Sequence, residues 1–108
     1  MSTRRGLALT LVALLAAACA STQVTESDRL RAQAAYERGL MHLKDRQPAP
    51  ALAALKEAVS VDPGVAEYHD TLGLVYLELA RPDLAVPELR SAVEIDPKSA
   101  NAHFHLGT

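Results

Sequence analysis

The chain has 108 residues, with 11 basic and 13 acidic side chains and a formal net charge of −2. This length supports one small domain. The acidic balance leaves no basic patch for nucleic acid, and a single cysteine excludes an internal disulfide, so any stability must come from packing.

The N-terminal stretch 1–18 has the pattern of a secretory signal peptide. Arg4 and Arg5 give a basic start, and residues 6–18 are almost wholly apolar and end in small residues just before the only cysteine, Cys19. This apolar run is shorter than the roughly 20 residues that a membrane-spanning helix needs. We therefore predict a signal peptide over residues 1–18. The alternative is a short transmembrane anchor.

The three alanines before Cys19 resemble the bacterial lipobox. In that motif the cysteine is diacylated and becomes the mature N-terminus, so the resemblance implies that Cys19 is the lipidation site. Ordinary cleavage after the alanines is the alternative. Lipoproteins of enteric type are retained in the inner membrane by an Asp after the cysteine, and Ala20 stands here. The resemblance therefore implies a lipid anchor in the bacterial outer membrane, facing the periplasm. Without residues 1–18, nine basic and thirteen acidic residues remain, a formal charge of −4.

Residues 19–27 are polar beyond the cysteine and show no hydrophobic period, which predicts a flexible tether. A first helix is expected to begin near Ser27 or Asp28, because their side-chain oxygens can cap free backbone N–H groups, and to end at about Lys44. After a turn over residues 45–48, a second helix is predicted over roughly 49–61, where apolar side chains recur at helical spacing.

A second pair of helices is predicted over about 66–79 and 82–95. Pro82 suits the first turn of a helix, whereas Pro87 removes the bond to the Asp83 carbonyl and is expected to bend that turn. Residues 100–108 read as the opening of another helix that has no partner after it. We therefore expect the chain to be incomplete. The alternative is a short protein that finishes its core on a partner.

The chain also repeats itself at a constant offset along the sequence. The matching residues are Gly39/Gly73/Gly107, Ala51/Ala85, Leu55/Leu89, Ala58/Ala92, Asp62/Asp96 and Pro63/Pro97. Their residue numbers differ by 34 in every pair, and a period of 34 predicts stacked helical hairpins. The small residues let the two helices of one hairpin touch, the leucines fill the space between repeats, and each Asp-Pro pair ends one helix and turns into the next.

This pattern resembles the tetratricopeptide repeat, whose helix A reads roughly W-x2-L-G-x2-Y and whose helix B carries A-x3-F, then A, then P. The residues of the second repeat that match are Leu72, Gly73, Tyr76, Ala85, Leu89, Ala92 and Pro97. The first repeat departs from the pattern at Arg38 and His42. The resemblance implies an all-α fold of tetratricopeptide-repeat helical hairpins, an α-solenoid. Repeat one then covers 28–65, repeat two covers 66–99, and residues 100–108 start a third.

In this family, helix A of each repeat lines a concave peptide-binding groove through its second, fifth, ninth, twelfth and thirteenth positions. Carried over by position, the resemblance implies as groove residues Gln33, Tyr36, Leu40, Leu43 and Lys44, then Glu67, Asp70, Leu74, Leu77 and Glu78, and finally Asn101 and Phe104. Such a groove is apolar in the middle and acidic at one side, which suits a peptide with apolar anchors and basic flanks. The alternative for the four leucines is packing against neighbouring helices.

Chaperone-binding members of the family clamp a peptide C-terminal carboxylate with Lys and Asn side chains. The corresponding positions here carry Gln33, Tyr36, Glu67 and Asp70, so that function is not expected.

The residues of this chain do not form a catalytic motif. His103 and His105 are two residues apart, which on a helix separates their side chains by about 200°, so they cannot hold one metal as an i, i+4 pair could. His69 and His103 occupy a slot that usually holds a large aromatic residue, and they are expected to pack. The sequence contains no phosphate loop, nucleophile elbow or zinc-ligand motif. We expect neither an enzyme nor a metal or other cofactor.

The lipidated cysteine, the short tether and the immediate run of repeats resemble the type IV pilus biogenesis and stability lipoprotein family, which acts as a pilotin for the secretin ring. The strings that carry this resemblance start at Tyr36, Ala58 and Ala92. It implies an outer-membrane-anchored periplasmic scaffold whose partner is an envelope protein such as a secretin subunit. Two alternatives are an adaptor lipoprotein for peptidoglycan or protein-processing enzymes, and the non-catalytic front of a longer enzyme.

Overall fold

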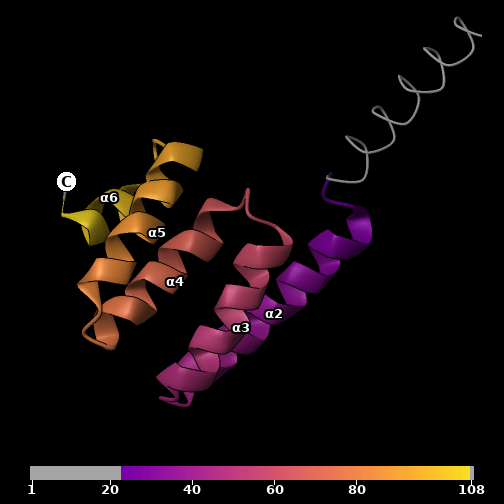
Figure 1. Cartoon of the computed structure of the whole chain (residues 1–108), viewed down its shortest axis with the longest axis horizontal. Helices are drawn as coiled ribbons and strands as arrows, with labels where there is room; N and C mark the ends of the chain where they lie inside the picture. The colour runs from indigo at the N-terminus through magenta and orange to yellow at the C-terminus, as the bar shows by residue number, and fades with distance from the viewer. Residues whose placement is uncertain (1–22, 108) are drawn as a thin grey trace, which may run out of the picture.

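The computed structural model describes residues 23–107, so the predicted signal peptide, Cys19 and the start of the tether lie outside it. Within this range the helices are, in chain order, α2 (Glu26–Lys44), α3 (Pro48–Val61), α4 (Ala66–Glu78), α5 (Pro82–Ile95) and α6 (Ala100–Leu106). Helices α2 and α3 form one hairpin, α4 and α5 form a second, and α6 packs on the second (Figure 1). Residues 23–107 contain helices and no strand, which confirms the all-α prediction. None of these helices is long and apolar enough to cross a membrane.

Helix α2 begins at Glu26 because Thr25 caps it. Thr25 Oγ1 accepts a hydrogen bond from the Asp28 N–H at 3.1 Å, and Asp28 Oδ2 accepts one from the Thr25 N–H at 3.1 Å. This reciprocal pair is a capping box, and the backbone hydrogen bond from Thr25 holds the pKa of Asp28 below its ordinary value. The helix therefore begins one residue before Ser27, close to its predicted start, but the residue that caps it is Thr25 and not Ser27 or Asp28, because Asp28 lies inside the helix and reaches back.

Helices α3 and α5 both begin with a proline. Pro48, predicted to lie in the turn, is the first residue of α3, and Pro82 opens α5 as predicted. A proline is tolerated there because the first N–H groups of a helix have no partner within the helix. Helix α5 has its predicted bounds and continues through Pro87, whereas α4 ends one residue before the predicted end at Leu79.

The turn inside each hairpin repeats at the same offset as the glycines and leucines. Arg46 and Ala80 have φ angles of 57° and 56°, in the left-handed region. In both hairpins the residue that follows this left-handed residue donates its N–H to the carbonyl oxygen five residues earlier in the chain, at 2.8 Å. This is a Schellman ending, in which the left-handed residue is usually Gly because Gly has no Cβ to clash with the backbone.

Replacing Ala80 with Gly is expected to raise the free energy of unfolding by about 0.5–1 kcal/mol. The left-handed conformation costs Ala about 1–2 kcal/mol, of which the greater freedom of Gly in the unfolded chain offsets a part. Urea denaturation of the variant measures the change. The control is Ala53→Gly in the middle of α3, where φ is helical and a loss of about 1 kcal/mol is expected. An equal loss of stability in Ala80→Gly and Ala53→Gly would show that the left-handed conformation does not strain Ala80.

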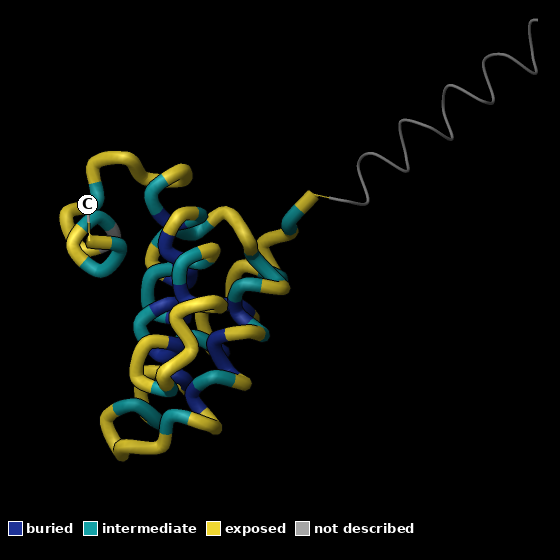
Figure 2. Tube along the Cα trace, turned by 60° about the vertical axis from the view of Figure 1, so that its left-hand side comes forward, coloured by how far each residue is buried: buried dark blue, intermediate teal, exposed yellow. Residues whose placement is uncertain are grey.

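The core is built mainly from small side chains where helices meet. The fully buried alanines are Ala32, Ala35, Ala51, Ala58, Ala85 and Ala92. Figure 2 shows the buried residues in the interior between the helices, whereas exposed residues dominate the turns. Because alanine projects only a methyl group, the helix axes of one hairpin can lie close together. The predicted role of the small residues therefore matches their position in the structure.

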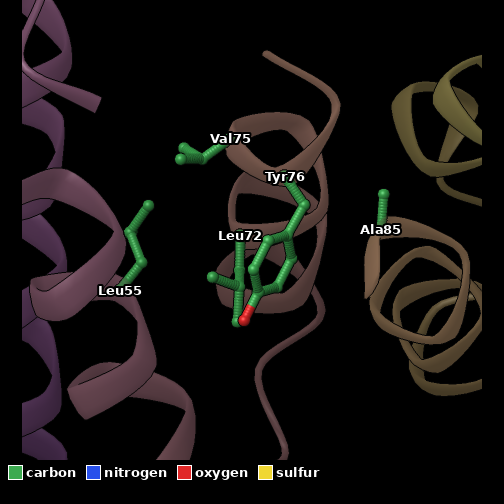
Figure 3. Packing of buried hydrophobic residues seen from close by; sticks show 5 residues of the cluster. All are labelled: Leu55, Leu72, Val75, Tyr76 and Ala85. Carbon is green, nitrogen blue, oxygen red and sulfur yellow. The ribbon is translucent and has the colours of Figure 1, made fainter. Parts of the chain in front are cut away.

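Each hairpin glycine lies directly under a leucine of the opposite helix. A Cβ added to Gly39 would lie 2.8 Å from Leu55 Cγ and Cδ2, and one added to Gly73 would lie 2.7 Å from the same atoms of Leu89. Leu55 also reaches the next repeat, where it packs in a cluster with Val75 and Tyr76 of α4 (Figure 3). The leucine at this position therefore does more than predicted, because it joins the two helices of one hairpin and also joins that hairpin to the next.

Candidate protein-binding face

The side chains predicted to bind a partner lie on α2, α4 and α6, and we call their surface the helix-A face. Its members are Gln33, Tyr36, Leu40, Leu43, Lys44, Glu67, Asp70, Leu74, Leu77, Glu78, Asn101 and Phe104. Three large apolar side chains of this face are exposed, namely Leu40 (42%), Leu77 (38%) and Phe104 (81%). These side chains are the apolar surface that a partner could cover on this face.

The four leucines of the helix-A face divide into two pairs. Leu40 and Leu77 are exposed, whereas Leu43 and Leu74 are half-buried. Leu43 packs against the core cluster around Leu55. The alternative that these leucines pack against neighbouring helices is therefore correct for Leu43. Leu40 and Leu77 are therefore the two leucines whose side chains are the more available to a partner.

Tyr36 joins α2, which is helix A of the first repeat, to α4, which is helix A of the second. Its ring lies against that of Tyr68, with centroids 4.8 Å apart. Its hydroxyl donates to Glu67 Oε1 at 3.2 Å and lies 3.2 Å from Thr71 Oγ1. Burial raises the pKa of the Tyr36 phenol above its ordinary value, which keeps the proton on the hydroxyl. Tyr36 is therefore engaged by α4, and only part of its side chain remains for a partner.

Asp70 makes the corresponding contact one repeat later. It lies 2.9 Å from Nδ1 of His105, and both side chains are half-buried. The two contacts are equivalent, since each joins residues 35 apart: Tyr36 to Thr71 and Asp70 to His105. Each helix A is thus tied to the next by a polar contact. Thr71 and His105 were not among the predicted binding residues, although the repeat offset relates them to each other and could have indicated a shared role.

His69 is buried between the two helices of the second hairpin, in keeping with the expected packing. Its Nε2–H donates to the Pro63 carbonyl at 2.7 Å, since a carbonyl can only accept, and its Nδ1 lies 2.7 Å from Glu88 Oε2. The first of these contacts recurs at the equivalent position of the next repeat, where His103 Nε2 lies 2.7 Å from the Pro97 carbonyl. Among residues 23–107, no three His, Cys, Asp or Glu side chains are placed to hold a metal ion.

Removing the carboxylate of Glu88 by substitution with Ala is expected to lower the free energy of unfolding by about 1–3 kcal/mol. The reason is that Nδ1 of the buried His69 would lose its partner. Glu88→Gln is expected to lose less, because its amide can still donate to a neutral ring nitrogen. Urea denaturation compares the two with Glu94→Ala, a change at an exposed position of the same helix. Equal losses for all three would contradict the contact's importance.

A comparison with known protein families and structures adds to this geometry. The tetratricopeptide repeat family model matches residues 66–99. The two hairpins have the tetratricopeptide-repeat fold. No curated protein sequence matches the chain.

Solved structures with a similar fold include the following three. The crystal structure of MamA is 26% identical, with a TM-score of 0.68 over 70% of this chain and 44% of that one. The Arabidopsis OM64 TPR domain is 24% identical, with a TM-score of 0.72 over 74% of this chain and 66% of that one. The second TPR of Spaghetti (RPAP3), bound to the HSP90 peptide SRMEEVD, is 18% identical, with a TM-score of 0.72 over 77% and 79%. The chain thus spans less than half of MamA and just under two thirds of the OM64 domain.

Proposed function

We propose that this protein is an envelope scaffold that binds another protein on its helix-A face while Cys19 anchors it to the periplasmic side of the bacterial outer membrane. The observation that carries the proposal is the row of stacked A helices, on which Leu40 and Leu77 remain exposed. Burying such side chains against a partner would remove apolar surface from water, and this gain would offset part of the freedom that the two proteins lose on association.

A scaffold role agrees with the fold, which typically serves as a non-catalytic scaffold, and we assign no chemical step to the chain. One protein with this fold, the second TPR of Spaghetti, is bound to a peptide in its solved structure. The support for the anchor comes from the sequence alone, where the small residues before Cys19 resemble a lipobox. Together these features favour a tethered binding module.

Within this role, the client that we propose is a secretin subunit in type IV pilus biogenesis. The support is the order of features in the sequence: a cysteine in a stretch that resembles a lipobox, then a short polar stretch, then the repeats. A deletion strain is then expected to lack pili and to accumulate monomeric secretin. Altered wall chemistry with pili intact would instead favour an adaptor for peptidoglycan enzymes.

The anchor is tested by labelling cells with radioactive palmitate. The wild-type chain is expected to take up the label and to fractionate with the outer membrane, whereas Cys19→Ser is expected to be unlabelled. Two acyl chains provide enough buried CH2 groups for stable attachment, at about 0.8 kcal/mol each. A wild-type protein that is unlabelled and soluble in the periplasm would contradict the lipid anchor and with it the pilotin assignment.

A further inference from the structure

We infer that the segment bound by the helix-A face carries an apolar anchor next to basic side chains. This inference rests on the proposed function, because it names the chemistry of the client at the same surface. It commits to a basic segment and against an acidic one. The apolar exposure, the charges and the internal contacts of α4 favour such a segment.

Leu77 is exposed near the C-terminal end of α4. The neighbouring core residues Val75 and Tyr76 are buried, so the exposure of Leu77 does not reflect a loosely packed helix. Leu40 of α2 is exposed on the same helix-A face. An apolar side chain of a client can therefore remove apolar surface from water on this face.

The charge of α4 is wholly acidic. Its 13 residues include Glu67, Asp70 and Glu78, and neither Lys nor Arg. Two of these carboxylates already have partners within the chain, since Tyr36 donates to Glu67 and His105 pairs with Asp70. Glu78 is exposed and makes no ion pair or side-chain hydrogen bond within residues 23–107. It is therefore the carboxylate of the helix-A face most open to a cationic partner.

Glu78 also occupies an unfavourable place for a carboxylate. It is the last residue of α4, where unpaired backbone carbonyls concentrate negative partial charge. No basic residue lies in the last turn of α4 to offset it. A Lys or Arg of a client that contacts Glu78 while an apolar neighbour covers Leu77 would relieve this repulsion. An acidic segment such as SRMEEVD, seen on the second TPR of Spaghetti, would add to it.

The test is the selection of random dodecapeptides, displayed on phage, against the immobilised full-length protein. We expect enrichment of peptides in which Lys or Arg adjoins Leu, Ile or Phe. Glu78→Gln should weaken the affinity of the synthetic consensus peptide by about two- to fivefold, the range for one exposed ion pair. Salt at high concentration should reduce this difference, because exposed charges are screened.

Glu94→Gln is the matched control. Glu94 is also an exposed Glu in the last turn of a helix, but it lies on α5 and outside the helix-A face. The two substitutions should leave the melting temperature unchanged or slightly raised, and only Glu78→Gln should weaken peptide binding. Equal weakening by both would overturn the inference.

The remaining outcomes separate this inference from the proposed function. Enrichment of acidic or uncharged peptides, with binding lost in Leu77→Ser, would overturn the basic client and leave the binding face in place. Absence of any enrichment, or enrichment unchanged by Leu40→Ser and Leu77→Ser, would overturn both, because the helix-A face would not be the surface that binds. In either case Leu77→Ser must retain the wild-type circular dichroism, which its exposed position leads us to expect.

Discussion

Valine in place of Gly73 is expected to lower the free energy of unfolding by about 3 kcal/mol, at the upper end of what overpacking usually costs. A Cβ at this position would lie 2.7 Å from Leu89 Cγ and Cδ2 and 3.3 Å from the Ala85 carbonyl oxygen. Leu89 is 1% exposed and has no solvent into which to turn, and the carbonyl can move only with α5. The better helix propensity of Val is worth well under about 1 kcal/mol and does not offset the clash.

Gly64→Val provides the control for this prediction. An added Cβ at Gly64 meets no atom within 4 Å, so its effect should stay within about 0.5 kcal/mol. A second check is Leu89→Ala in the Gly73→Val background. Because the smaller side chain vacates the contested space, the double variant should be more stable than the sum of the single losses implies. If the two losses of stability were strictly additive, the side chains at positions 73 and 89 would not be in contact.

Truncating Leu55 to Ala is expected to lower the free energy of unfolding by about 2–5 kcal/mol, as for other buried leucines. Leu55 is 0% exposed, lies over Gly39 in its own hairpin, and packs against Val75 and Tyr76 of the next. The cavity would therefore weaken two interfaces at once. The total free energy of unfolding of a small domain is about 5–15 kcal/mol, so a large share of the stability would be lost.

Urea denaturation followed by circular dichroism measures this loss. Leu30→Ala serves as the control, because Leu30 is 60% exposed and its truncation should change the stability by less than about 0.5 kcal/mol. If Leu55→Ala and Leu30→Ala were equally mild, the cluster between α3 and α4 would not hold the two hairpins together.

The repeat offset made the fold predictable, because a glycine and a leucine that recur at the same offset fix which helices touch. The start of α2 was less predictable. Thr25, Ser27 and Asp28 can all cap a helix, and only the reciprocal bond between Thr25 and Asp28 decides among them. Pro48 posed the same difficulty, since a proline is equally at home in a turn and at a first helical position.

The candidate site was predictable in its positions and less so in its contacts. The pattern assigned Tyr36 and Asp70 to a binding surface, but in the structure both contact the following helix A. These contacts depend on how far successive A helices are displaced along their axes. The spacing of residues within one repeat does not determine that displacement. His105 was weighed only as a metal ligand with His103, whereas its partner is Asp70 on a helix one repeat earlier.

Site-specific photo-crosslinking in living cells tests whether the helix-A face binds a partner. A photoreactive amino acid replaces Leu77 on this face or Lys56, which is exposed on α3 and lies outside it. We predict a discrete adduct with another protein from position 77 and none from position 56. An adduct from position 56, with none from position 77, would contradict the account, because the partner would then bind a different surface of the repeats.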